Sequence, residues 1–167
     1  MTGPLAIRPE EVGDHSGIRA VHWAAFGGPA EAALVDALRE AGDLVLALVA
    51  AAGGPVGHVA FPRLTIEGGG ARVVALAPLA VLPDWHGRGI GTGLVEAGLD
   101  WLREAGEDLV LVRGHPAYYR RFGFSPEPLR ALRTPWDGPH MQALALTPQG
   151  REAAGPVAYP PAFAALL

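Results

Sequence analysis

The chain has 167 residues, 50% of them hydrophobic and 18% charged, which is typical of one folded domain and not of a disordered segment. A net charge of -4 excludes a broad basic surface for nucleic acid or an anionic membrane, and no run is apolar for long enough to span a bilayer. Cysteine, lysine and asparagine are absent, which excludes disulfides, thiolate metal sites and cysteinyl intermediates.

We therefore expect a single domain over residues 1–167. Met1-Thr2-Gly3-Pro4 does not resemble the start of a signal peptide, so we expect a cytoplasmic protein with neither nucleic acid nor a membrane as its partner. The spacing of the six histidines contains no compact ligand set, so no metal site is expected.

The first half of the chain predicts a strand, two helices and an antiparallel pair of strands. Asp14 or Ser16 caps the first helix, Pro29 opens the second, and the glycine turn at 53–55 joins the paired strands. The apolar run at 44–51 is typical of a strand that is buried on both faces. In chain order, the predicted elements are a strand at 5–8, helices to about 26 and from 29 to about 42, and strands at 44–51 and 56–64.

The second half predicts a long strand that leads through a glycine turn into a helix. Pro78 interrupts this strand and marks a bulge, or a place where the neighbouring strand has moved away, because proline cannot donate to a sheet. A helical crossover makes the next strand parallel to it. The predicted elements are a strand at 72–82, a helix to 106, a strand at 108–112, a short helix at 116–122, a strand at 141–146 and a packed apolar tail at 155–167.

The glycine turn at residues 85–93, Trp-His-Gly-Arg-Gly-Ile-Gly-Thr-Gly, is the most informative segment. A strand that turns through glycines into a helix leaves backbone N–H groups without partners at the positive end of the helix dipole, which favours a phosphate. A P-loop is excluded because it requires a lysine. A dinucleotide fingerprint fails because Thr92 stands where its third glycine belongs.

This segment, from His86 through Gly87, Gly89 and Gly91, resembles the coenzyme A pyrophosphate motif of the GNAT superfamily of N-acetyltransferases, Gln/Arg-x-x-Gly-x-Gly/Ala. His86 stands where the family has Gln or Arg. A second block, Tyr119 to Phe124, resembles the family's Tyr-x-x-x-Gly-Phe motif. The segment at 77–83 and the late Tyr159-x-x-x-Phe163 resemble the YhbS-like branch, so the resemblance covers about residues 5–163.

The resemblance implies an α/β fold with a mixed, mostly antiparallel sheet of six or seven strands flanked by helices, splayed between its fourth and fifth strands. It implies acetyl-CoA as co-substrate, Tyr119 as the residue that protonates or hydrogen-bonds to the departing thiolate, and the Val81 amide as oxyanion donor. Arg88, Arg120 and Arg121 are candidates for the cofactor phosphates, with Arg120 favoured as a solvated side chain. The residues implied to bind coenzyme A are Leu79, Ala80, Val81, His86, Gly87, Arg88, Gly89, Ile90, Gly91 and Thr92.

The predicted reaction is direct transfer of an acetyl group to a primary amine in a ternary complex. A non-catalytic acyl-CoA-binding sensor or interaction module is the alternative, and a longer acyl donor also stays open. The acceptor is a small-molecule or peptide amine that the sequence does not identify, and the resemblance is compatible with a homodimer. Candidates for the base that removes the ammonium proton are Glu67, His58, His115, Asp84 and a chain of waters.

Overall fold

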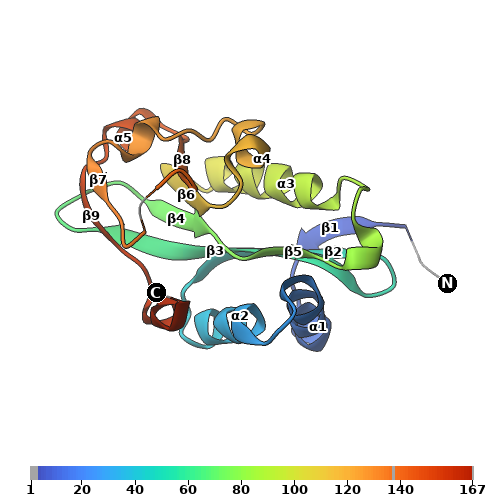
Figure 1. The fold of residues 1–167 in the computed structure, drawn as a ribbon. Helices are drawn as coiled ribbons and strands as arrows, with labels where there is room; N and C mark the ends of the chain where they lie inside the picture. Colours follow the sequence, from blue (N-terminus) through green and yellow to red (C-terminus); the bar gives the residue numbers. More distant parts are fainter. Residues whose placement is uncertain (1–3, 137, 167) are drawn as a thin grey trace.

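The structure of the protein, a computed structural model, describes residues 4–136 and 138–166 (Figure 1). The expectations for Met1, Thr2 and Gly3 and for the tail end at Leu167 lie outside the described residues.

The described residues form five α-helices, nine strands and four 3₁₀ turns. The α-helices are α1 (His15–Phe26), α2 (Ala30–Glu40), α3 (Ile90–Glu104), α4 (Pro116–Arg120) and α5 (Pro148–Glu152). The strands are β1 (Ala6–Pro9), β2 (Leu44–Ala51), β3 (Pro55–Ile66), β4 (Val73–Leu76), β5 (Leu79–Val81), β6 (Leu109–Arg113), β7 (Leu132–Arg133), β8 (Met141–Ala145) and β9 (Gly155–Ala158). The 3₁₀ turns are η1 (Val12–Asp14), η2 (Pro83–Trp85), η3 (Glu127–Leu129) and η4 (Pro161–Leu166).

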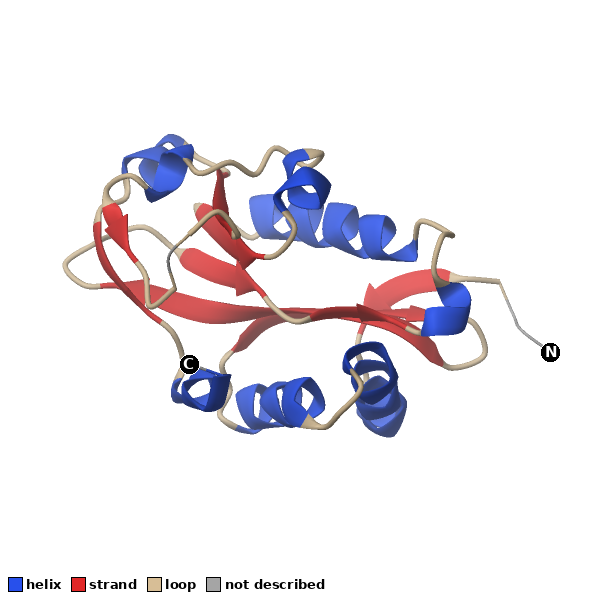
Figure 2. Cartoon of the chain, viewed as in Figure 1, coloured by secondary structure: helices blue, strands red, loops and turns tan. Residues whose placement is uncertain are grey.

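These strands form one sheet between two layers of helix. The main strand order is β1-β2-β3-β4-β6-β8, with β5 and β9 also paired to β3. The helices α3 and α4 cover one face, whereas α1, α2 and the C-terminal η4 cover the other (Figures 1 and 2). Most pairs are antiparallel, and β4 with β6 and β7 with β9 are parallel. The predicted fold class is confirmed.

The predicted strand at 72–82 is broken at Pro78 into β4 and β5. β4 runs parallel to β6 from Val73 opposite Leu109 to Leu76 opposite Val112. Beyond that point β5 pairs with β3 and, within the described residues, has no register with β6. The sheet therefore opens where Pro78 has no amide hydrogen to donate. This is the predicted splay between the fourth and fifth strands of the sequence analysis.

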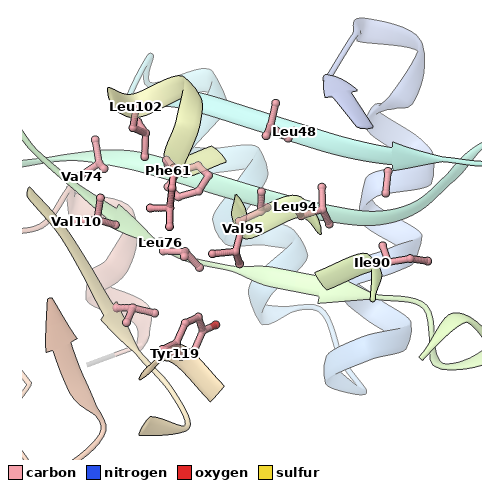
Figure 3. Close-up of a cluster of buried hydrophobic side chains, with 14 of the residues drawn as sticks. Leu48, Phe61, Val74, Leu76, Ile90, Leu94, Val95, Leu102, Val110 and Tyr119 are labelled. Carbon is pink, nitrogen blue, oxygen red and sulfur yellow. The ribbon is translucent and has the colours of Figure 1, made fainter. Parts of the chain in front are cut away.

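The core above the sheet explains the position of α3. The apolar side chains of this helix recur at helical spacing and pack on Phe61 of β3 and on β4 and β6, as Figure 3 shows for Leu94, Val95 and Leu102. Complete burial of each such side chain contributes about 1.5–3 kcal/mol. Tyr119 joins the same cluster from α4 (Figure 3).

Three details differ from the sequence expectations. Over the described residues the sheet has nine strands and not six or seven, because the predicted fourth strand splits in two and the short β7 and β9 have no clear alternation. The Asp14 carboxylate does not cap α1, since it accepts hydrogen bonds from the Arg8 guanidinium and the Glu11 amide. Within β2 only residues 48–50 are fully buried. Within the described residues, no helix is long and apolar enough to cross a membrane.

Candidate functional site: a split strand between two cavities

The glycine turn leaves backbone amides free at the start of α3. Gly87 and Gly89 have φ values of 76° and 75°, a left-handed conformation that glycine adopts without a steric cost. The first helical hydrogen bond runs from the Gly93 amide to the Gly89 carbonyl at 2.9 Å, so the N–H groups of residues 89–92 have no acceptor within the helix. Gly89, the N-cap, has no side chain to fill that role. The turn therefore presents several donors to an anion.

The strand before this turn also offers free backbone groups. The Ala60 amide donates to the Pro78 carbonyl at 3.1 Å, and the Leu82 amide donates to the Val56 carbonyl at 2.8 Å. Because backbone groups alternate in direction along an antiparallel pair, the groups of Ala80 face β3 and those of Leu79 and Val81 face the opened side.

One of those groups is already bonded. His86 Nε2 lies 2.9 Å from the Val81 carbonyl oxygen, and it is the donor because a carbonyl only accepts. His86, which stands where the family has Gln or Arg, therefore links β5 to the glycine turn by a hydrogen bond. The Val81 amide and both backbone groups of Leu79 stay oriented toward the opening.

The turn and β5 line one open cleft of about 510 Å³. All residues predicted to bind coenzyme A line it except Arg88, whose guanidinium lies 4.5 Å from the ring centroid of Trp85. Ala80 lines the cleft although its backbone groups face β3. The lining also contains residues absent from the predicted set, namely Trp85, Tyr118 and Arg121.

Tyr118 closes the cleft at the helix end. Its hydroxyl lies 3.3 Å from Thr92 Oγ1, and the Arg121 guanidinium lies 4.5 Å from its ring centroid. A Cβ at position 91 would lie 3.2 Å from the Tyr118 hydroxyl oxygen, so the absence of a side chain at Gly91 avoids a close contact with that hydroxyl. Of the three candidate arginines, Arg121 is the one whose side chain lines the cleft.

A second cavity, here called the aromatic cavity, lies beyond the break in the strand and has a volume of about 250 Å³. Its lining comprises Phe26, Glu31, Leu34, Ala75, Leu76, Ala77, Pro78, Leu79, Leu111, Arg113, Tyr119, Trp136, Tyr159, Phe163 and Leu166. Leu79 lines both spaces, so the cleft and the aromatic cavity meet at the first residue of β5.

Tyr119 is placed at this junction by close packing. Its ring packs edge to face against Tyr118 and Phe124, with centroid distances of 5.0 and 5.8 Å. A Cβ at Gly114 would lie 2.5 Å from its ring, so glycine is required there. Burial raises the pKa of Tyr119 to about 12, which keeps the phenol protonated at neutral pH.

None of the four side chains considered as bases lines either space. Asp84 and His115 are exposed, and Glu67 lies in the turn after β3. His58 is completely buried under α1, where its Nε2 lies 2.8 Å from Glu10 Oε1 and its Nδ1 lies 2.8 Å from Nε2 of the equally buried His22.

These contacts fix the tautomers of both histidines. The Glu10 carboxylate accepts, so His58 donates from Nε2 and accepts at Nδ1 from His22. Burial would raise the pKa of Glu10, but hydrogen bonds from His58 and Arg39 outweigh it and lower the pKa to about 2. Burial lowers the pKa of His22 to about 3 and lowers that of His58. The two rings are therefore neutral structural groups and not bases in contact with either cavity.

The polar residues of the aromatic cavity are not among the residues predicted from the sequence. Glu31 lies in the first turn of α2, where an acidic residue is common because it complements the helix dipole. Arg113 ends a buried strand, and its guanidinium lies 5.6 Å from the ring centroid of Trp136. No local pattern signals these residues, which come together only in the folded chain. In the described residues, no group of three or more His, Asp or Glu side chains could hold a metal ion.

Comparison with known proteins gives concordant results. The model of the acetyltransferase (GNAT) family matches residues 15–124. The chain is 42% identical to the N-acetyltransferase YhbS of Escherichia coli K12 over 136 residues, which cover 80% of this chain and 81% of that protein.

Solved structures agree with this similarity. The crystal structure of E. coli YhbS in complex with CoA matches with a TM-score of 0.89 and 38% identity, covering 98% of this chain and 95% of that chain. A GNAT family acetyltransferase from Brucella melitensis, in complex with acetyl-CoA, matches with a TM-score of 0.81 and 39% identity, covering 96% and 98%.

Proposed function

The chain belongs to the acetyltransferase (GNAT) family, and from this premise we propose that it transfers an acetyl group from acetyl-CoA to a primary amine by direct attack in a ternary complex. Two relatives crystallised with CoA and acetyl-CoA support the choice of co-substrate. The free amides at the start of α3 would bind the pyrophosphate, with Arg121 close by. The cleft-facing backbone groups of Leu79 would pair with the amides of the pantetheine arm, which leaves the Val81 amide free for the acetyl carbonyl.

In the proposed reaction the neutral amine nitrogen attacks the thioester carbonyl carbon. The C–N bond forms, the C–S bond breaks, and the sulfur leaves as a thiolate that takes a proton from Tyr119. The proton lost by the amine passes to solvent, since none of the four bases predicted from the sequence lines either cavity. Solvent then restores the proton to the phenolate. The Val81 amide would stabilise the negative charge that develops on the carbonyl oxygen, and one such donor contributes about 2.7–4 kcal/mol.

The junction at Leu79 is the observation that carries this proposal. Leu79 lines both a cleft suited to coenzyme A and a separate apolar cavity, and Tyr119 lines that cavity. Direct transfer requires two substrates that meet at one point beside a proton donor. The Leu79 amide points in the same direction as the Val81 amide, so Leu79 is the second candidate for the oxyanion donor.

The test is binding followed by turnover. Acetyl-CoA at 100 times its dissociation constant should add about 2.7 kcal/mol to the stability, seen as a higher melting temperature, whereas NAD and ATP at the same concentration should not. Free thiol should then appear at a rate that depends on an added amine. Binding without amine-dependent release from a broad amine panel would favour the acyl-CoA sensor. No binding of acetyl-CoA would refute both functions.

Two broader expectations remain predictions. We propose that residues 1–167 act as one acetyltransferase domain, in keeping with the single sheet over the described residues. We also propose that the protein acts in the cytoplasm.

A further inference from the structure

The aromatic cavity has the features of a site for a small apolar ligand. Three of its side chains, Trp136, Tyr159 and Phe163, pack edge to face with centroid distances of 4.6, 5.2 and 6.2 Å. Tyr159 and Phe163 come from the C-terminal segment and Trp136 from the loop after β7, and together they form an aromatic wall of the cavity. Such a wall favours a flat apolar body, because aromatic pairs gain about 0.5–1.5 kcal/mol beyond the area that they bury.

The charges of the lining restrict the ligand further. Within the described lining, Glu31 is the one carboxylate and Arg113 the one cationic side chain. Glu31 is half-buried and has no hydrogen-bond or ion-pair partner in the part of the chain that the structure describes. A carboxylate in an apolar cavity attracts an ammonium group. One carboxylate matches one ammonium, whereas a polyamine or an amino sugar with several ammonium groups would bury charges without partners.

The size of the cavity argues in the same direction. At about 250 Å³ it is smaller than the roughly 300–1,000 Å³ typical of sites for drug-sized ligands. Its side opposite the sheet is covered by η4, which packs on α2 through Phe163 against Leu34 and Leu38. A cavity of this size does not accommodate a folded protein surface, but an amine carrying a single ring has room.

We propose that the aromatic cavity binds the acetyl acceptor, and that the acceptor is a small primary amine on a flat apolar body, such as an arylalkylamine. The inference rests on the proposed function, because the cavity meets the coenzyme A cleft at Leu79 and is lined by Tyr119. Glu31 attracts the ammonium form into the cavity, and the aromatic wall holds the body of the acceptor. The amine loses its proton before it attacks the thioester.

The first experiment compares acceptors at a fixed acetyl-CoA concentration and follows both the thiol and the acetylated product. Phenethylamine and tyramine should exceed putrescine, spermidine, an aminoglycoside and a lysine-containing peptide at least tenfold in kcat/KM. A preference for any of these other amines would overturn the proposed acceptor class while leaving acetyl transfer intact. Binding of acetyl-CoA without transfer to any amine would count against the proposed function itself.

The second experiment tests the cavity by calorimetric binding of phenethylamine to the protein saturated with CoA, which needs no turnover. Glu31→Gln and Trp136→Ala should each weaken binding about tenfold, through the lost charge and the lost ring contact. The matched controls are Glu40→Gln, on the same helix but outside the cavity, and Trp23→Ala, an exposed tryptophan on α1. Both controls should bind phenethylamine as tightly as the unchanged protein. Equal affinity in all four variants would place the acceptor elsewhere.

Discussion

Replacement of Tyr119 by phenylalanine separates a catalytic role from a structural one. The Tyr119 hydroxyl has no hydrogen-bond partner within the described residues, although the side chain is only 9% exposed. Its removal therefore costs no protein hydrogen bond, and the variant should be as stable as the unchanged protein or up to about 1 kcal/mol more stable. The ring contacts with Tyr118 and Phe124 stay in place.

The effect on catalysis should be opposite in sign. General acid catalysis typically contributes 10²–10⁴-fold, and a phenol whose pKa is raised to about 12 is a weak proton donor. We therefore expect a decrease in kcat of about 100-fold, which corresponds to about 2.7 kcal/mol in the barrier. The affinity for acetyl-CoA should change little, because Tyr119 lines the aromatic cavity and not the cleft.

Three measurements check this prediction: kcat from thiol release at saturating substrates, the dissociation constant of acetyl-CoA by calorimetry, and urea unfolding. Tyr118→Phe is the matched control, because its hydroxyl contacts Thr92 in the cleft. It should raise the KM for acetyl-CoA and leave kcat within about threefold. Unchanged kcat in Tyr119→Phe would remove the phenol from the mechanism, and a large loss of stability would show that its role is structural.

Four further predictions concern the backbone, the packing and the buried histidines. Val81→Pro removes a cleft-facing amide that forms no hydrogen bond to β3, so kcat should decrease about 10²–10³-fold while acetyl-CoA still binds. If Leu79→Pro lowers kcat and Val81→Pro does not, the oxyanion donor is Leu79. Gly89→Ala, at φ 75°, should weaken acetyl-CoA binding about tenfold by calorimetry, whereas Gly106→Ala, at φ 82° beyond the other end of α3, should reduce only stability. Gly98→Ala should lower the free energy of unfolding by about 1–2 kcal/mol in urea, since its Cβ would lie 2.5 Å from Phe61 Cε2, whereas Gly93→Ala, which meets only the flexible end of Ile7, should not. The pKa values of His22 and His58 are lower in the folded protein than the 6.5 of the unfolded chain. The free energy of unfolding should therefore fall between pH 6 and pH 5, by up to about 1.4 kcal/mol for each of the two histidines. His22→Phe should remove the contribution of one histidine from this pH dependence, and an unchanged slope would contradict the burial argument.

The parts of the site that depend on local backbone conformation could be predicted from the sequence. The glycines at 87 and 89 encode positive φ values directly, and Pro78 encodes the missing donor that ends the pairing of β4 with β6. Tyr119 was found through a motif whose glycine and aromatic residues shape one tight turn. Each of these signals lies within a few residues of the feature that it predicts.

The aromatic cavity could not be predicted in this way. Glu31, Arg113, Trp136 and Tyr159 come from four distant segments, and each has an ordinary local explanation. Glu31 stabilises a helix start, Arg113 ends a strand, and Trp136 and Tyr159 are aromatic residues in loops rich in proline. Their meeting depends on the path of the chain after β6 and on the docking of η4 against α2. Neither has a periodic signal in the sequence.

The register of β5 against β3 decides whether the site exists at all. A slip of one residue would turn the amides of Leu79 and Val81 toward β3 and leave those of Ala80 in the cleft. The hydrogen bonds from Leu82 to Val56 and from Ala60 to Pro78 hold this register at both ends of the short strand.

The packing of α3 on Gly57, which lies in β3 opposite Val81, supports the same register. A Cβ at Gly57 would lie 3.0 Å from Ile90 and 3.1 Å from Leu94, so the absence of a side chain lets the first turns of α3 approach the sheet. The helix whose N-terminus would bind the pyrophosphate and the strand that would bind the pantetheine arm thus pack against the same glycine. Their separation is therefore set by backbone contact and not by long side chains. A larger residue at position 57 should weaken acetyl-CoA binding without touching the ligand, because it would move the two halves of the cleft apart.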